Sequence, residues 1–251
     1  MKKIGVVIVA AGKGERLGTK IPKGLVKIAG REMFLYSLAA FQSVRGTKVV
    51  RGTSFISIVI PHGKGSLINK AIDLAGLQPV HALVDGGKLR QDSVRLGLES
   101  LPSDIDIVLI HDSARPFLLP KQIKDMISLV EKHGSASTAR RVGDTLRRGS
   151  TEKNTVFLKS IVDRENLWAL GTPQGFIHKD ILSAHKIVNL SGRIVSDDTA
   201  LISSRKPVAV LETDFLNSKI TYPSDLEMAE MMVIIWRKAF LKGGGKLPDG
   251  F

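Results

Sequence analysis

Stretches with the pattern of a buried β-strand alternate with stretches of helical pattern along the first half of this chain. The expected strands cover 4–10, 54–60, 80–84 and 106–110, and the expected helices cover 32–41, 66–75, 91–101 and 122–133, with Gly134 as a C-cap. Such alternation predicts a parallel sheet with helices on both faces. We therefore expect an α/β fold, a single Rossmann-like domain with a mostly parallel, twisted sheet.

Three polar loops follow these expected strands, over 12–23, 85–93 and 111–115. Ligands of a parallel sheet bind beyond the carboxyl ends of its strands. We expect the three loops to meet there and to form one site.

The first of these loops combines glycines with strong cations. Gly12, Gly14 and Gly18 alternate with charged residues, and Arg16 and Lys23 lie within the loop. Glycine lets a backbone come close to a ligand, and successive N–H groups can hold an anion. A polyphosphate site is the favoured interpretation. The alternative is a simple chain reversal, because the spacing is not that of a dinucleotide fingerprint and no Gly-Lys-Ser/Thr tripeptide is present.

The pattern changes after residue 135. A strand is expected over 136–142, and the strand-like runs 145–148 and 155–158 flank a polar turn, which predicts a hairpin. We interpret the region of about 142–165 as a protruding β-arm that clasps a partner, with an ordinary surface hairpin as the alternative.

The rest of the chain returns to the sheet and closes with a long helix. We expect strands over 167–170 and 208–211, a helix over 180–190, a helix N-cap around Asp197, and a helix over 224–241 capped by Ser224 with Glu227. The predicted domain therefore covers 1–241, followed by a flexible basic tail over 242–251.

The charge balance indicates anionic partners. There are 37 Lys and Arg residues against 24 Asp and Glu, a formal net charge of +13. Trp and Tyr number only two each, so aromatic platforms for nucleic acid are scarce and we expect no nucleic-acid partner. Cysteine is absent, which excludes disulfides and thiolate chemistry. No apolar run is long enough to span a membrane and no signal peptide is evident, so a cytoplasmic location without membrane partners is expected.

The loops taken together resemble a known family. The motifs occur in this order: Ala10-Ala11-Gly12, Arg16, Pro22-Lys23, Asp85-Gly86-Gly87, Arg90, Ser93, His111-Asp112, Ala114-Arg115-Pro116, Val162-Asp163-Arg164, Thr172-Pro173-Gln174 and Lys219-Ile220-Thr221. Over roughly residues 4–235 the chain resembles the 2-C-methyl-D-erythritol 4-phosphate cytidylyltransferases of the non-mevalonate isoprenoid pathway, enzymes of the nucleotidyltransferase type.

The resemblance implies a reaction and a set of catalytic residues. CTP and 2-C-methyl-D-erythritol 4-phosphate give 4-diphosphocytidyl-2-C-methyl-D-erythritol and pyrophosphate. By resemblance, Arg16 and Lys23 stabilise the reacting α-phosphate, while Arg164 and Lys219 position the acceptor phosphate. The implied cofactor is Mg²⁺, bridged mainly by the CTP phosphates with Asp112 as a candidate ligand. The implied assembly is a homodimer through the β-arm, in which Arg164 acts in the partner's site.

The resemblance also implies which residues bind the two substrates. The nucleotide-binding set is Ala10, Ala11, Gly12, Gly14, Gly87, Lys88, Arg90, Ser93, Asp112 and Ser113. The acceptor-binding set is Asp112, Arg115, Arg164, Thr172 and Lys219. His111 is interpreted as structural, because the reaction needs no general base. Lys88 and Ser113 depart from the family pattern, and no consequence is attached to Asp198-Thr199.

Each assignment has an alternative. Considered alone, Asp112 could pair with Arg115, and Arg164 with Asp163 or Glu165. Lys23, Ser93, Thr172 and Lys219 could be ordinary turn, helix or edge-strand residues. For the whole chain the alternatives are a ribitol-5-phosphate cytidylyltransferase, a hexose-1-phosphate nucleotidyltransferase, and a nucleotide-binding relative without catalysis.

Overall fold

A computed structural model describes residues 2–19, 21–44, 55–249 and 251. The strands are β1 (Ile4–Val9), β2 (Lys27–Ile28), β3 (Arg31–Glu32), β4 (Phe55–Ile60), β5 (Ala82–Asp85), β6 (Ile107–Asp112), β7 (Ser135–Arg141), β8 (Leu146–Glu152), β9 (Thr155–Val162), β10 (Trp168–Ile177) and β11 (Ala209–Glu212). The α-helices are α1 (Met33–Ser43), α2 (Gly65–Leu74), α3 (Arg90–Glu99), α4 (Pro120–His133), α5 (His178–Ser191) and α6 (Pro223–Lys242). Short 3₁₀ helices cover η1 (Glu15–Leu17), η2 (Lys23–Leu25), η3 (Asp198–Leu201) and η4 (Phe215–Asn217).

The main sheet has the strand order β11-β7-β10-β6-β1-β4-β5. The pairs β6–β1, β1–β4, β4–β5 and β11–β7 are parallel, whereas β10 runs antiparallel to both of its neighbours. This confirms the expected α/β fold with a mostly parallel sheet. Ser54, the expected first residue of the second strand, lies outside the described residues.

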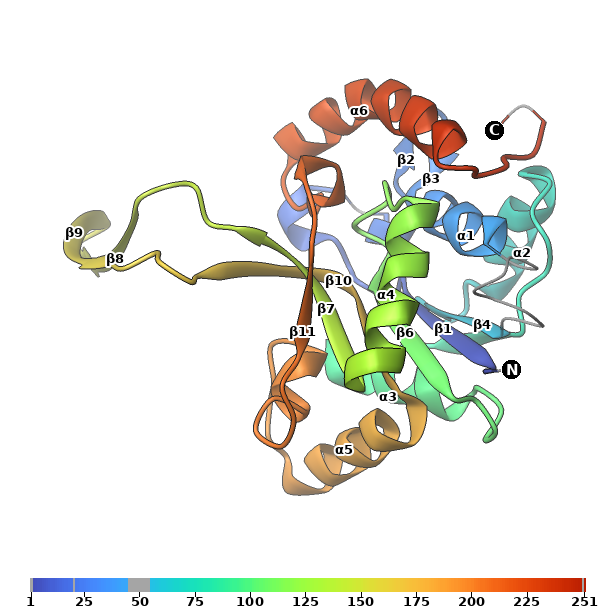
Figure 1. The fold of residues 1–251 in the computed structure, drawn as a ribbon. Helices are drawn as coiled ribbons and strands as arrows, with labels where there is room; N and C mark the ends of the chain where they lie inside the picture. Colours follow the sequence, from blue (N-terminus) through green and yellow to red (C-terminus); the bar gives the residue numbers. More distant parts are fainter. Residues whose placement is uncertain (1, 20, 45–54, 250) are drawn as a thin grey trace.

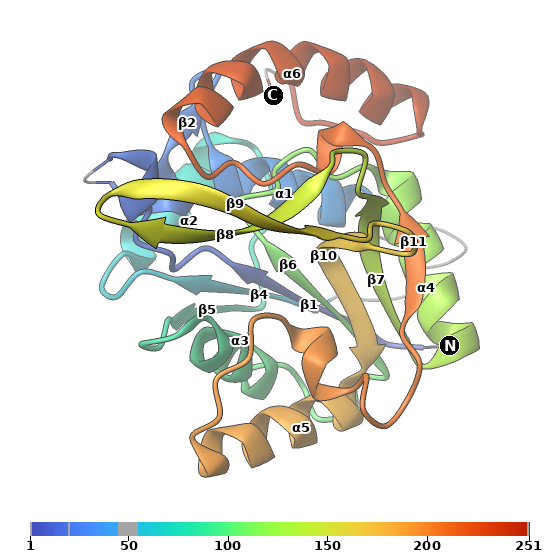
Figure 2. The ribbon, with the colours of Figure 1, turned by 90° about the vertical axis from the view of Figure 1, so that its left-hand side faces the viewer.

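Helices cover both faces of this sheet. Figure 2 shows α1 and α6 on one side and α3 and α5 on the other. Side chains of β1 alternate between the two resulting cores, with Val6 and Ile8 in one and Val7 in the other. Helix α3 packs so closely that a Cβ on Gly97 would lie 2.5 Å from the Val7 side chain, so glycine is required there. The expected C-cap of α4 is confirmed, because Gly134 has φ 82°.

The β-arm, formed by β8 and β9, extends away from the body of the molecule (Figure 1). The predicted polar turn over 149–154 is too long. Strand β8 continues to Glu152, and only Lys153 and Asn154, with φ 46° and 68°, form the turn. Two left-handed residues match the twist of a hairpin, which allows the strands to pair almost to the tip.

Two further boundaries differ from the prediction. Strand β10 continues through 171–177, with an irregular register between Leu170 and Gln174 that contains Pro173, a residue with no N–H to donate. At α6 the expected Ser224 cap is wrong. The Asp225 carboxylate instead accepts hydrogen bonds from the backbone N–H groups of Thr221 and Tyr222, at 2.7 and 2.9 Å. The expected N-cap at Asp197 is confirmed, although the helix that follows is the short η3.

The segment after α6 was expected to be a flexible tail, and its last residue instead packs onto the body. Phe251 is buried, and its ring lies 5.5 Å from the Tyr36 ring, edge to face. The Arg31 guanidinium carbon lies 4.7 Å from the centroid of the Phe251 ring. This apolar contact argues against a freely frayed end. In the described part of the chain, no helix is both long and apolar enough to cross a bilayer.

Candidate active site

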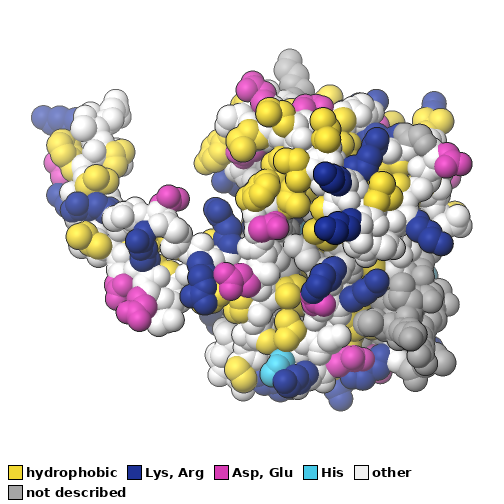
Figure 3. All heavy atoms as spheres, turned by 45° about the horizontal axis from the view of Figure 1, so that its top comes forward, with side chains coloured by type: hydrophobic (Ala, Val, Ile, Leu, Met, Phe, Trp, Pro, Cys, Tyr) yellow, Lys and Arg dark blue, Asp and Glu magenta, His cyan; other side chains and the backbone are white. Residues whose placement is uncertain are grey.

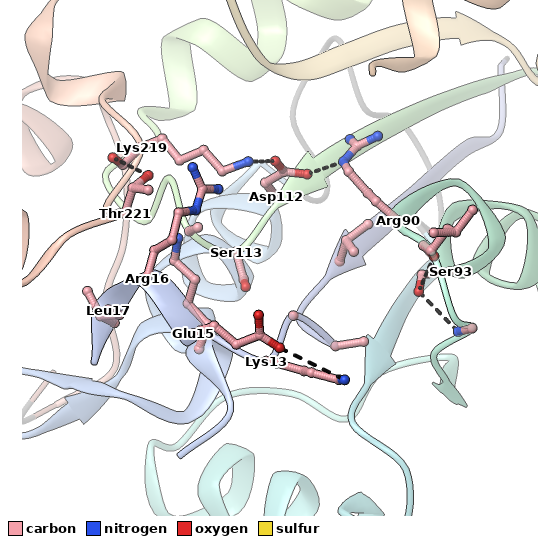
Figure 4. Close-up of a pocket in the computed structure, with 18 of the residues that line it drawn as sticks. Lys13, Glu15, Arg16, Leu17, Arg90, Ser93, Asp112, Ser113, Lys219 and Thr221 are labelled. Carbon is pink, nitrogen blue, oxygen red and sulfur yellow. Dashed lines mark hydrogen bonds and ion pairs between the residues drawn. The ribbon is translucent and has the colours of Figure 1, made fainter. Parts of the chain in front are cut away.

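A cavity of about 600 Å³ opens at the carboxyl ends of β1 and β6 (Figure 4). All three predicted loops contribute to its wall, which confirms that they meet at one edge of the sheet. The predicted residues that line it are Ala11, Gly12, Gly14, Arg16, Lys23, Gly87, Lys88, Arg90, Ser93, Asp112, Ser113 and Lys219. Ala10, Arg115, Arg164 and Thr172 do not line this cavity.

The first loop is shaped by its glycines. The short helix η1 lies between Gly14, with φ 77°, and Gly18, with φ 69°, conformations that favour glycine. Leu17 anchors the loop in the core, and the Lys23 N–H donates to the Gly12 carbonyl at 2.9 Å. The loop is therefore held at both ends while Arg16 and Lys23 line the cavity.

Lys23 lies among other cations. Burial, followed by the charges of Lys219 and Arg16, lowers the pKa of Lys23 to about 8. Neither Arg16 nor Lys23 forms an ion pair with a residue in the described ranges. Their charges are therefore available to an anion that enters the cavity.

Asp112, the last residue of β6, is held between two cations (Figure 4). One carboxylate oxygen accepts from Arg90 Nε at 2.9 Å, and the other accepts from Lys219 Nζ at 2.7 Å. Burial alone would raise the pKa of Asp112, but these two partners hold that pKa well below its usual range. Asp112 is thus ionised at neutral pH.

The alternative pairing of Asp112 with Arg115 is wrong for the side chains. The Arg115 guanidinium donates to the backbone carbonyls of Asn217 and Leu170, at 2.6 and 3.1 Å. Arg115 contacts Asp112 only through its backbone N–H, which donates to the Asp112 carbonyl at 2.9 Å.

The second loop leaves no room for side chains at its glycines. A Cβ on Gly87 would lie 2.3 Å from Asp92 Cβ. The Ser93 hydroxyl accepts from the Gly87 N–H at 3.1 Å and donates to the Leu89 carbonyl at 3.2 Å. Ser93 therefore fixes the shape of this loop as well as lining the cavity.

His111 and Thr172 support the site from below. His111 is fully buried, and burial lowers its pKa to about 4, so it is neutral. Its ring nitrogens lie 3.0 Å from the Arg115 carbonyl and 3.2 Å from the Thr172 hydroxyl. The same hydroxyl accepts from the Asp112 N–H at 3.0 Å. Thr172 thus braces Asp112 and does not line the cavity.

A second, smaller cavity of about 310 Å³ adjoins the first at the base of the β-arm. Its wall includes Arg115 and Arg140, together with Lys219, which borders both cavities. The Nε atom of Arg115 and the Oδ1 atom of Asn217 are buried without a hydrogen-bond partner in the described structure. Buried polar atoms of this kind are costly unless something pairs with them. Arg140 carried no sequence signal beyond its charge.

Arg164 is not brought to either cavity. It lies exposed beside the β-arm, where its guanidinium donates to the Gly143 carbonyl. It forms no ion pair with Asp163 or Glu165, both of which the structure describes.

The residues present do not form a metal site by themselves. In the described ranges, no group of three or more His, Asp or Glu side chains is placed to hold a metal ion. Both oxygens of Asp112 already accept a hydrogen bond from a cation. A divalent metal here would take most of its oxygen ligands from a bound phosphate.

A mostly parallel sheet with a glycine-rich, cation-lined cavity at its carboxyl edge is the architecture of an α/β nucleotidyltransferase. The family model described as "IspD: 2-C-methyl-D-erythritol 4-phosphate cytidylyltransferase" matches residues 4–234. The chain belongs to this family of cytidylyltransferase enzymes.

Individual relatives agree with the family match. The chain is 33% identical to the 2-C-methyl-D-erythritol 4-phosphate cytidylyltransferase of Geobacillus kaustophilus over 90% of its own length and 95% of the relative's. It is 32% identical to that of Pelotomaculum thermopropionicum, over 98% and 100%. The crystal structure of the Thermus thermophilus enzyme of the same name superposes with a TM-score of 0.71 at 28% identity, covering 93% of this chain and all of that one. The ribitol-5-phosphate and hexose alternatives find no support in these matches.

Proposed function

We propose that this chain transfers CMP from CTP to the phosphate of 2-C-methyl-D-erythritol 4-phosphate. An acceptor phosphate oxygen forms a bond to the α-phosphorus of CTP, and the bond from that phosphorus to the oxygen bridging the α- and β-phosphates breaks, releasing pyrophosphate. The observation that carries the proposal is the pair of adjoining cavities that share Lys219. Two anions repel each other, and a shared cation lowers that repulsion where they must meet.

The larger cavity is the proposed CTP site. Arg16 and Lys23 have no carboxylate partner in the described ranges, and we assign them to the α-phosphate and the leaving pyrophosphate. The small residues Ala11, Gly12 and Gly87 leave room for the nucleoside. Ala10 lies just beneath, where a Cβ on Gly24 would meet its Cβ at 2.9 Å, so we assign it to the support of the loop.

The remaining residues of the predicted nucleotide set line the same cavity. We keep Gly14, Lys88, Arg90, Ser93 and Ser113 in the proposed CTP site on that ground. Arg90 is already bound by carboxylates, so its proposed role is to hold Asp112 in place.

The smaller cavity is the proposed acceptor site. Lys219, Arg115 and Arg140 border it together with Asp214 and Asp225, a mixed set of cations and carboxylates suited to a phosphate that carries hydroxyl groups. Asp112 lies at the boundary through its contact with Lys219. Thr172 takes part through its bond to the Asp112 N–H.

The β-arm is the proposed dimer contact. Val156, Leu158 and Ile161 on β9 are 65%, 66% and 69% exposed, and Figure 3 shows hydrophobic side chains along the arm. An isolated two-stranded ribbon is marginally stable and gains by burying such side chains. We propose that two copies exchange arms and that Arg164 thereby reaches the partner's acceptor site.

Mg²⁺ is the proposed cofactor, which the triphosphate oxygens would mainly hold, with Asp112 as a candidate protein ligand. When bound, the metal neutralises phosphate charge. The expected cytoplasmic location stays a prediction.

A pyrophosphate-release assay tests the proposed reaction. The purified protein is given CTP, Mg²⁺ and either 2-C-methyl-D-erythritol 4-phosphate, ribitol 5-phosphate or a hexose 1-phosphate, and UTP replaces CTP in a parallel series. We expect release only with CTP and the erythritol phosphate. Turnover with ribitol 5-phosphate alone, or with UTP and a hexose phosphate alone, would reject the proposal.

A further inference from the structure

Asp198 is a fully buried carboxylate that lines neither cavity, yet it contacts the wall of the larger one. Its Oδ2 atom accepts from Arg90 Nη1 at 2.9 Å. The same guanidinium donates through Nε to Asp112, also at 2.9 Å. Arg90 thus joins a carboxylate at the start of η3 to a carboxylate at the end of β6.

Asp198 is fixed from the protein interior. Its backbone N–H donates to the buried Gln174 side chain at 3.1 Å. Its second carboxylate oxygen lies 3.1 Å from Nε2 of His185, a buried residue of α5. The carboxylate therefore cannot follow Arg90 if the guanidinium moves.

A guanidinium is a rigid planar fork, so two carboxylates bound to different nitrogens define its orientation. With a single partner it could rotate about that contact. Because Arg90 holds one oxygen of Asp112 while the other oxygen holds Lys219, the orientation of Arg90 sets where the Lys219 ammonium lies.

We propose that Asp198 is a positioning residue, which acts through Arg90 and Asp112 to hold the Lys219 ammonium at the boundary of the two cavities. The inference rests on the function proposed for Lys219. Asp198 itself touches neither substrate. The competing interpretation is that Asp198 only stabilises the fold.

The test is a double-mutant cycle in the full-length protein. D198N keeps the side-chain volume and removes the charge. K219M removes the ammonium that Asp198 is proposed to position. We expect D198N to lower kcat by about tenfold, and to have less than about a twofold effect in the K219M background, because coupled residues are not additive. The unfolding midpoint of every variant is measured alongside.

Ile127→Ala is the control for lost stability alone. Ile127 is buried on α4, in the core on the other face of the sheet from α5. We expect its unfolding midpoint to fall at least as far as that of D198N while kcat stays within about twofold of the parent value. If D198N does not fold, D198S serves in its place.

The results distinguish failure of the function proposed for Lys219 from failure of the positioning role of Asp198. If K219M retains the parent's turnover, the function proposed for Lys219 fails, and the positioning role fails with it. If K219M is impaired but D198N keeps its kcat, or lowers kcat equally in both backgrounds, only the positioning role is overturned. Equal losses of kcat in D198N and I127A would mean that Asp198 acts through stability alone.

Discussion

The Asp112 carboxylate accepts a 2.7 Å hydrogen bond from the Lys219 ammonium, although the two residues lie 107 positions apart in the chain. This bond joins the end of β6 to the segment before α6. It leaves Lys23, Arg16 and Lys88 as the cations of the larger cavity that have no carboxylate partner in the described residues. The site thus contains cations that are held and cations that are free to meet a substrate.

Replacement of Lys23 by alanine is expected to lower kcat by at least ~100-fold, because its charge is used mainly in the transition state. Initial rates of pyrophosphate release at saturating CTP measure the loss. Lys27→Ala, which removes an exposed ammonium that lines neither cavity, is the control and should stay within about threefold. Near-normal turnover by K23A would remove Lys23 from the proposed mechanism.

The pH dependence should report the state of Lys23. As its pKa is about 8, kcat/KM for CTP is expected to fall as the pH rises through about 8, because the free protein loses the charge. K23R should keep its charge and lack this falling limb if it remains active. A flat profile of the parent between pH 7 and 9 would contradict the assignment.

The lowered pKa of Lys23 also affects the stability of the folded chain. The pKa of Lys23 is lower in the folded chain than its ordinary value of 10.5, so the unfolded chain binds more protons between about pH 8 and 10.5. Below pH 8 the charged Lys23 therefore lowers the free energy of unfolding, and this loss disappears as the pH rises across the window. K23M should unfold at a higher temperature than the parent at pH 7, and the difference should shrink toward pH 10.

Arg164 should act in the partner's site if the arms are exchanged. Co-expression of K23A and R164A chains with different tags gives mixed dimers that carry one site with both residues intact. Random pairing then restores about a quarter of the parent activity, whereas either variant alone stays nearly inactive. If Arg164 acts within its own chain, the mixture recovers nothing. A monomer in sedimentation analysis at assay concentration would reject the exchange itself.

Two glycines of the site should fail in different ways. Gly87→Ala places a Cβ 2.3 Å from Asp92 Cβ, so we expect a loss of about 1–3 kcal/mol in the free energy of unfolding. No described atom lies within 4 Å of a Cβ on Gly12, so Gly12→Ala should fold normally and raise the KM for CTP. Chemical denaturation and steady-state kinetics on both variants check the contrast.

The meeting of the loops at the carboxyl edge was predictable, because the succession of strands and helices along the chain can be inferred from local pattern. The alternation of strands and helices places 12–23, 85–93 and 111–115 together whatever the side chains do. The partners of Asp112 were not predictable in this way. The nearest cation in the sequence, Arg115, turns to backbone carbonyls, while Arg90 and Lys219 come from distant elements.

Asp198 had no assigned role for the same reason. Its importance depends on Arg90, 108 positions earlier, and on burial by α5, neither of which the local sequence carries. Two signals were available: its place directly after the Asp197 cap, and the attention that the family resemblance drew to Asp198-Thr199. The packing of Phe251 against the body was not predicted, because a segment rich in glycine and lysine is typical of a flexible terminus.

Lys219 forms part of the wall of both cavities, so in the proposed reaction one ammonium would lie beside both reactants. A phosphate bound beside the ammonium offsets its positive charge, so a second phosphate is attracted less strongly. A surplus of polyol phosphate would then compete with the nucleotide for this group, and the enzyme would slow when its acceptor is too abundant. Because the two sites share one cation, the order in which the reactants bind and the ratio of their concentrations would both affect the rate.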